Sequence, residues 1–141
     1  MLSNMPRDDQ ELRLTIQRLA RRIRSMQADE AITEGQRSAL FALSNVGAQT
    51  LGSLSEHERV TPPSMNRTVN ALVEAGLVTR VVSPDDGRKV VLDLSDAGRS
   101  FVAETRRRRD AWFTKRLAAL TPAQRAIIAE AAPILRELAD S

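Results

Sequence analysis

Side chains that can pair with the edges of DNA bases gather on one face of a predicted helix between Pro62 and Ala75. Ser64, Arg67 and Asn70 share that face, and Asn66 lies at its edge. Arginine donates to guanine O6 and N7, asparagine pairs with adenine N6 and N7, and serine pairs with several bases. The opposite face is apolar at helical spacing and carries Met65, Val69, Leu72 and Val73. The pattern predicts a helix that packs on a core and presents polar groups to a DNA groove, although any solvated helix face is also polar.

A charged turn follows this helix and joins two predicted strands, Leu77–Val82 and Lys89–Leu94. Ser83-Pro84-Asp85-Asp86-Gly87 is a sequence that favours a tight turn. Arg88 at its tip suits the minor groove, whose negative potential attracts guanidinium groups, and Asp86 can hold Arg88 or a backbone amide in position. Further phosphate contacts are expected from Arg80 and Lys89. A solvated surface hairpin would look similar by itself, but the hairpin and the preceding helix together favour a winged helix-turn-helix that binds DNA.

Capping residues set the expected order of the elements that position this surface. A first helix is expected from Asp8 to Met26. The later helices should begin at N-cap residues, which are Thr33, Thr50, Thr61, Ser95 and Thr121. Gly47 should end the second helix and Gly76 the fourth, and the fifth should run from Asp96 to about Leu120. The short spacing between the third and fourth helices is typical of a helix-turn-helix.

Apolar spacing also predicts which helix faces are covered. The second helix should bury Ala39, Leu40, Leu43 and Val46, and the last helix carries an apolar stripe of Ile127, Ala131, Ile134, Leu135 and Leu138. Pro133 lies inside that last helix, where an interior proline costs roughly 3 kcal/mol. A kink or break is therefore expected between Ala129 and Pro133. The terminal helices carry more apolar surface than the core of a small protein needs.

Composition limits the possible functions. A chain of 141 residues with 42% hydrophobic and 28% charged residues is expected to be one soluble globular domain over 1–141. Aromatic residues make up 3% of the chain, too few for the stacking platforms that bind single strands, so duplex DNA is the expected partner. The N-terminus lacks the apolar segment of a secretory signal and no run is long enough to span a bilayer. We expect a cytoplasmic protein without a membrane partner.

An enzymatic function is not expected. The chain has no cysteine and one histidine, His57, which argues against thiolate nucleophiles, cysteine zinc sites and histidine-rich metal sites. No pairing of a nucleophile with a base is apparent, and no glycine-rich phosphate loop occurs. We therefore expect no cofactor and no metal. The remaining alternative to DNA binding is a helical protein-interaction adaptor with a winged-helix fold that does not read DNA.

Four motifs in order resemble the MarR family of bacterial transcriptional regulators. They are TPPSMNR at 61–67, LVEAGLVTR at 72–80, DDGRK at 85–89 and LDLSDAG at 92–98. The resemblance implies a mainly α (α+β) fold, with a winged helix-turn-helix over 33–95 and N- and C-terminal dimerisation helices over 8–27 and 96–139. It also implies a homodimer on a pseudo-palindromic operator with half-sites about one helical turn apart. A ligand-responsive repressor is expected, whose effector is a small lipophilic or phenolic molecule.

The residues and the resemblance together assign the DNA-binding positions. Those of the recognition helix are Thr61, Ser64, Asn66, Arg67 and Asn70, and those of the hairpin, or wing, are Arg80, Asp86, Arg88 and Lys89. Arg88 would enter the minor groove with Asp86 as its support. The resemblance does not identify the residues of an effector pocket.

Other polar and aromatic residues have more than one interpretation. His57 is expected to be structural or on the surface. Arg106 to Arg109 could contact DNA flanks or pair with acidic residues across a dimer, but simple solvation is the favoured interpretation. Trp112 and Phe113 are expected to pack in a core or a dimer interface rather than to line a ligand site.

Overall fold

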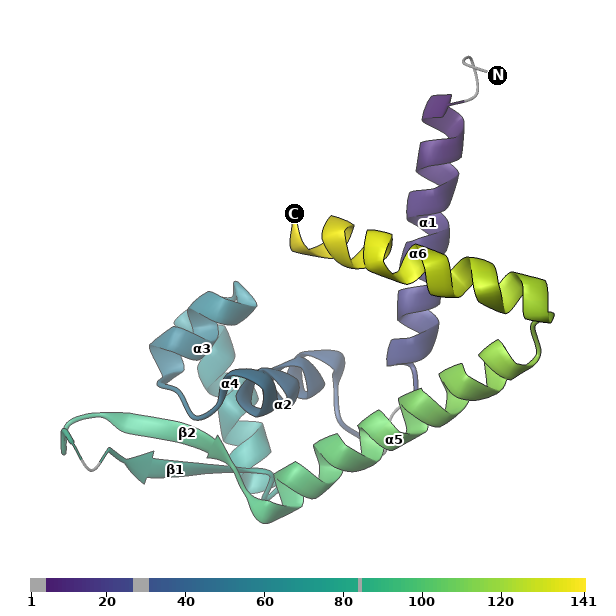
Figure 1. The fold of residues 1–141 in the computed structure, drawn as a ribbon. Coiled ribbons are helices and arrows are strands. Elements are labelled where there is room, and N and C mark those ends of the chain that lie inside the picture. The colour runs from purple at the N-terminus through teal and green to yellow at the C-terminus, as the bar shows by residue number, and fades with distance from the viewer. Residues whose placement is uncertain (1–4, 27–30, 84) are drawn as a thin grey trace. The chain divides into compact units, whose positions relative to one another are not determined.

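The computed structural model describes residues 5–26, 31–83 and 85–141. Its elements are α1 (Met5–Arg24), α2 (Glu34–Val46), α3 (Leu51–Glu58), α4 (Pro62–Glu74), β1 (Val78–Val82), β2 (Val90–Leu94), α5 (Asp96–Ala118) and α6 (Pro122–Asp140) (Figure 1). The mainly α fold with a two-stranded antiparallel sheet confirms the expected winged helix-turn-helix. Two of the expected positions, Gln27 and Pro84, lie outside the described residues.

The predicted caps account for most of the helix starts. Thr33 and Thr121 each form a capping box with the glutamine three residues on, and Thr50 and Thr61 each accept a hydrogen bond from a backbone amide of the first turn. Ser95 does the same for α5, because its Oγ accepts from the amide of Gly98 at 3.0 Å. These contacts satisfy amides that a helix leaves unpaired at its N-terminus.

The first helix differs most from its predicted bounds. It begins at Met5, before the predicted Asp8, and ends at Arg24 rather than Met26. Proline is tolerated in the first turn of a helix because the amide it lacks has no partner there. Pro6 is therefore compatible with the earlier start. Asp8 still lies in the first turn, where its charge favours the helix dipole.

The chain forms two compact units, which are described separately. The central unit spans 27–107, and the terminal unit combines 1–26 with 108–141. The first part of α5 belongs to the central unit and the rest of it to the terminal unit. The predicted winged module over 33–95 falls within the central unit.

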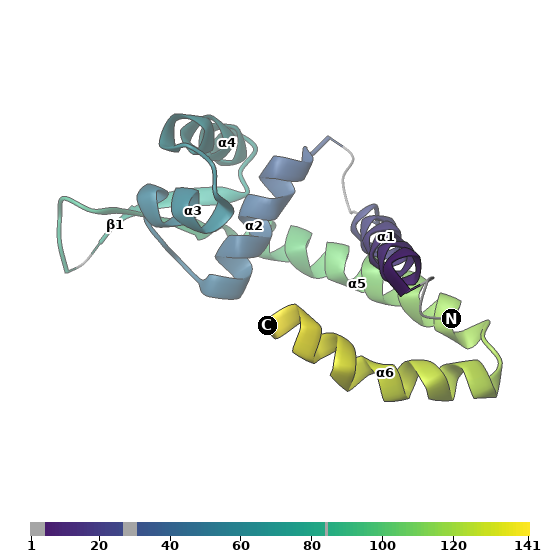
Figure 2. The same cartoon turned by 90° about the horizontal axis from the view of Figure 1, so that it is seen from above.

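The core of the central unit brings together α2, α3, α4, the two strands and the start of α5. Its fully buried large side chains are Leu40, Leu43, Leu54, Leu72, Val69, Val102 and Thr105. The strands pair in antiparallel register from Val78 opposite Leu94 to Val82 opposite Val90. Gln49, just before α3, adds an isolated bridge to Leu92, with backbone hydrogen bonds of 3.0 and 2.8 Å. The hairpin is thereby tied to the helices at its base, while its tip projects beyond them (Figures 1 and 2).

Val46 does not belong to the buried face of α2, contrary to the sequence prediction. Its side chain is 58% exposed, although Ala39, Leu40 and Leu43 are buried as predicted. Val46 is the last residue of the helix, and Gly47 follows with φ of 100°. The chain turns away from the helix axis there. Val46 therefore continues the apolar spacing of α2 but lies beyond the part of the helix that packs on the core.

The terminal unit leaves large apolar side chains exposed. No residue of α6, all of which the structure describes, is buried. In α1 the exposed residues include Leu12, Leu14, Ile16 and Leu19, and in α6 they include Ile127, Ile128, Ile134, Leu135 and Leu138. The predicted stripe of α6 is therefore present as a helix face, but within one chain it has little cover.

The sequence predicted a kink or a break near Pro133. The break is wrong, because α6 continues through Pro133. The helix is continuous from Pro122 to Asp140, and it curves along its length (Figure 2). A curved helix can accommodate the proline ring and the missing amide without ending.

Of the described helices, none is long and apolar enough to span a bilayer.

Candidate nucleic-acid interface

Helices α3 and α4 are joined by a tight turn at residues 59–61. Arg59 adopts the left-handed conformation with φ of 56°, and its amide donates to the carbonyl of Glu56 at 3.2 Å. Thr61 then caps α4 by accepting from the amide of Ser64 at 3.4 Å, with Pro62 and Pro63 in the first turn. This geometry is that of a helix-turn-helix, in which the second helix is the one that enters a DNA groove.

The two faces of α4 are separated as predicted. Met65, Val69 and Leu72 are buried, and Val73 is partly buried against the same core. Asn66, Arg67 and Asn70 are exposed, while Ser64 is half-buried and Thr61 is exposed at the cap. The apolar face is confirmed, and on the opposite face Asn66, Arg67 and Asn70 are exposed, whereas Ser64 is not fully exposed.

The end of α4 is fixed to the start of the wing. Gly76 has φ of 78°, a left-handed conformation that glycine adopts without strain. The amide of Leu77 donates to the carbonyl of Leu72 at 2.9 Å. Farther along β1, the guanidinium of Arg80 donates from Nη2 to Oδ1 of Asn70 on α4. The recognition helix and the wing are thus joined by backbone and side-chain contacts.

The wing tip is organised around Asp86. Its Oδ1 accepts from the backbone amide of Arg88 at 3.0 Å, and its carbonyl accepts from the amide of Lys89 at the same distance. Of the two supporting roles predicted for Asp86, the structure shows the contact with the backbone amide. The side chains of Arg88 and Lys89 are exposed. Together with Arg67 and Arg80, they place four cations along α4 and the wing.

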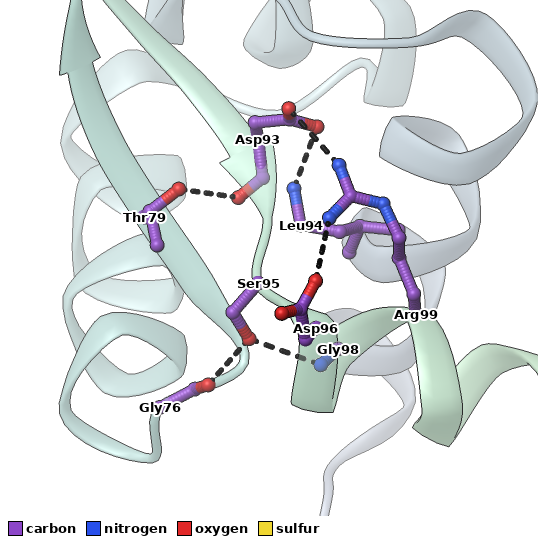
Figure 3. A network of polar contacts seen from close by, with 8 residues as sticks. All are labelled: Gly76, Thr79, Asp93, Leu94, Ser95, Asp96, Gly98 and Arg99. Carbon is purple, nitrogen blue, oxygen red and sulfur yellow. Dashed lines mark hydrogen bonds and ion pairs between the residues drawn. The ribbon is translucent and has the colours of Figure 1, made fainter.

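A polar joint connects α4, the wing and α5 (Figure 3). Ser95 Oγ donates to the carbonyl of Gly76 at 2.5 Å while accepting from Gly98, and the Ser95 amide donates to the carbonyl of Leu77 at 3.0 Å. Sequence reasoning identified Ser95 only as a cap. It missed the contact with Gly76, because nothing in local spacing shows that the end of α4 lies beside the start of α5.

Charged residues reinforce the same joint. Arg99 on α5 pairs with Asp93 of β2 at 3.3 Å and with Asp96 at 3.5 Å. The carbonyl of Asp93 accepts from Thr79 Oγ1 at 3.4 Å, and its Oδ1 accepts from the amide of Leu94 at 2.8 Å (Figure 3). Arg99 and Asp93 are both more than a third exposed, so the ion pair itself contributes little stability. The pair links α5 to the end of β2.

The arginine run of α5 is not simply solvated, contrary to the favoured interpretation. Nη2 of Arg106 donates to Asn45 Oδ1 at 2.5 Å, and its guanidinium lies 5.3 Å from the centre of the Phe41 ring. Arg107 pairs with Glu104 at 2.6 Å on the same helix. Arg106 therefore fastens α5 to α2 within the central unit.

His57 and Trp112 have the environments expected of them. His57 is exposed on α3. Trp112 is half-buried in the terminal unit, with Arg22 and Arg116 over its ring at 5.7 and 5.3 Å. Such contacts between cations and an aromatic ring stabilise packing.

Comparison with known proteins places this geometry in a family of regulators. Residues 32–90 match the model of the MarR family. Over 140 residues the chain is 39% identical to a helix-turn-helix-type transcriptional regulator from Mycobacterium tuberculosis, covering 99% of this chain and 98% of that protein.

Two solved structures have the same fold. A protein from Pseudomonas aeruginosa superposes with a TM-score of 0.85 at 26% identity, covering 98% of both chains. A MarR family protein from Bacillus stearothermophilus superposes with a TM-score of 0.80, covering 100% of this chain and 99% of that one. The latter is 20% identical, so the similarity concerns the fold.

Proposed function

This chain belongs to the MarR family of transcriptional regulators, and from that premise we propose that it is a homodimeric repressor of a pseudo-palindromic operator. Family membership implies DNA binding. The operator symmetry, the repression and a response to a small lipophilic or phenolic effector are parts of the proposal. Its action would be binding rather than catalysis, and it would take place in the cytoplasm.

The observation that carries the proposal is the placement of one polar helix face and one basic hairpin in a single compact unit. Asn66, Arg67 and Asn70 are exposed on α4. The wing, which carries the cations Arg80, Arg88 and Lys89, is joined to the end of that helix. An α-helix fits the major groove of B-form DNA, and a narrow hairpin bearing arginine fits the adjacent minor groove. We assign base contacts to Ser64, Asn66, Arg67 and Asn70, and minor-groove contact to Arg88.

The remaining assigned residues would contact or support the DNA backbone. Thr61 lies at the N-terminus of α4, where amides and the helix dipole favour phosphate. Arg80 and Lys89 would contact phosphates from the wing. Asp86 would act through the Arg88 amide that it holds at 3.0 Å.

The exposed apolar faces of the terminal unit support the homodimer. Ile127, Ile134 and Leu138 on α6 are each at least 60% exposed, and Leu12 on α1 is 56% exposed. Large contiguous apolar surfaces on soluble proteins mark interaction sites. A second copy of the chain would present the same faces, and a two-fold dimer would place two recognition helices on one DNA duplex. We therefore assign dimerisation to the helices over 8–27 and 96–139, and DNA binding to 33–95.

The test is an electrophoretic mobility shift of the full chain on the DNA upstream of its own gene, at two salt concentrations. Specific binding that weakens steeply with salt is expected, because bound cations release counterions from phosphates. Arg67→Ala should weaken binding to the preferred sequence more than binding to random duplex. Arg107→Ala is the matched control, because it removes one cation that pairs with Glu104 away from α4 and the wing. Absence of salt-sensitive binding to any duplex would refute the proposal and favour the adaptor alternative.

A further inference from the structure

We infer that Arg80 fixes the orientation of the Asn70 side chain, so that Asn70 presents a hydrogen-bond donor rather than a donor–acceptor pair to the DNA base that it faces. This inference rests on the proposed function, because it concerns how the recognition helix reads DNA. It changes the role of Arg80 from a phosphate contact alone to a positioning residue that sets base preference.

The contact that carries the inference joins α4 to β1. Nη2 of Arg80 donates a hydrogen bond to Oδ1 of Asn70, and both residues are exposed. A guanidinium group has five N–H donors and no acceptor. Whichever amide atom of Asn70 faces Arg80 must therefore be the oxygen, and the Nδ2 amide group is left for another partner.

The fold explains why these two side chains meet. Val78 and Arg80 lie on the same face of β1, because alternate residues of a strand share a face. Val78 is buried against the core, and Arg80 is paired across the sheet with the buried residue Leu92. Helix α4 packs against β1. Arg80 therefore leaves the strand on the side that faces α4, and its long side chain reaches the exposed position of Asn70.

The chemical consequence concerns adenine. Asparagine recognises adenine through two bonds, in which its oxygen accepts from N6 and its nitrogen donates to N7. The oxygen Oδ1 has two lone pairs, but the Arg80 guanidinium donates to it and competes with adenine N6 for it. The Nδ2 group can still donate freely to guanine O6 or N7 or to thymine O4. The preference for adenine expected of a free asparagine should be weakened, and bases that offer only acceptors at this edge should be favoured.

Arg80 retains donors for a second contact. One N–H is directed at Asn70, and the others can bind a phosphate at the same time. Phosphate contacts fix the position of a protein on the duplex without reading its sequence. An arginine that bridges a phosphate and Asn70 would hold the amide at a constant distance from the base edge.

The experiment is selection of bound sequences from a duplex library randomised over the binding site, using the full chain. Asn70→Ala identifies the base pair that Asn70 reads, since the preference there should disappear. Arg80→Met removes the guanidinium but keeps an apolar side chain of similar reach. At that base pair the wild type should favour guanine or thymine, and Arg80→Met should raise the adenine-to-guanine ratio about fivefold or more.

Two further variants separate this role from a general loss of charge or folding. Arg107→Ala should leave the base preference unchanged. Asn70→Asp keeps an oxygen for Arg80 but removes the donor, and it should abolish the preference while circular dichroism shows a folded chain. If Arg80→Met does not fold, the base that the wild type favours at the position of Asn70 still tests the inference, because a free asparagine would favour adenine.

The outcomes distinguish the inference from the function on which it rests. If the wild type enriches a motif but favours adenine at the position of Asn70, or if Arg80→Met leaves the preference there unchanged, the role of Arg80 is refuted and the DNA-binding function stands. If Asn70→Ala enriches the same motif as the wild type, Asn70 reads no base, and the role of Arg80 is refuted as well. If the wild type enriches no motif at all, the proposed function and this inference both fail.

Discussion

A β-carbon placed on Gly98 would lie 2.1 Å from the carbonyl oxygen of Leu77, so the first turn of α5 rests directly on the backbone that joins the recognition helix to the wing. The same carbonyl accepts from the amide of Ser95 at 3.0 Å. Only a residue without a side chain allows this approach. The start of α5 and the end of α4 are therefore fixed to each other inside the central unit.

Replacing Gly98 with alanine should destabilise the protein. The added methyl group meets a backbone carbonyl, which cannot move aside without breaking its bond to Ser95. We expect a loss of at least about 1–3 kcal/mol, as for other overpacked sites, measured by thermal or urea unfolding. Gly35→Ala is the control, because nothing lies within 4 Å of a β-carbon there, and alanine in a helix should be neutral or stabilising. Unfolding of Gly98→Ala at the wild-type midpoint would contradict the close approach.

Removing the hydroxyl of Ser95 should loosen the same joint in a different way. Ser95→Ala loses the cap of α5 and the hydrogen bond to Gly76. The expected cost is about 1–2 kcal/mol in the free energy of unfolding. Ser100→Ala, at an exposed position inside α5, should change stability little, since alanine is the better helix former. Equal stabilities of the two variants would show that the Ser95 contacts contribute nothing.

The sequence predicted the elements of this joint but not the joint itself. Caps such as Thr33 and Ser95 are local signals, and each satisfies amides within a few residues of itself. The glycine that ends α4 was also predictable, because the helix needs a residue that tolerates positive φ at that point. The contacts of Ser95 with Gly76 and of Arg99 with Asp93 depend on how distant segments pack. The periodicity of apolar residues does not predict that packing.

The errors have the same origin. Val46 continues the apolar spacing of α2 but stands at the last turn, where the chain turns away. Arg106 lies in a charge run that resembles a solvated face, yet its partners Asn45 and Phe41 are on α2. For the candidate site, the helical spacing of apolar residues correctly separated Asn66, Arg67 and Asn70 from the core. The spacing could not show that Asn70 accepts a hydrogen bond from Arg80.

The side-chain oxygen of Asp86 that accepts from the Arg88 amide should support DNA binding by ordering the wing tip. Asp86→Ala removes the acceptor that holds the amide of Arg88, whereas Asp86→Asn keeps an oxygen acceptor and makes the same change in charge. Because both variants remove one negative charge near DNA, their difference isolates the hydrogen bond. Asp86→Asn should bind duplex at least as tightly as the wild type, and Asp86→Ala should bind several-fold more weakly than Asp86→Asn, measured by fluorescence anisotropy. Identical affinities of the two variants would show that the bond does not order the wing.

A charge on the exposed face of α6 should separate the proposed dimer. Ile127 is 64% exposed in the single chain, and burying its side chain against a second copy would contribute about 1.5–3 kcal/mol. Ile127→Glu would lose that contribution and add the cost of burying a carboxylate, so the dimer should weaken by about 100-fold or more. Sedimentation equilibrium should show the wild type at twice the 15.6 kDa mass of the chain and the variant shifted towards a single chain. Val82→Glu is the control, because Val82 is 58% exposed on the wing, outside the terminal unit, and its change should leave the mass unaltered. A wild-type mass for Ile127→Glu at low micromolar concentration would place the dimer interface elsewhere, and a single-chain mass for the wild type would refute the homodimer.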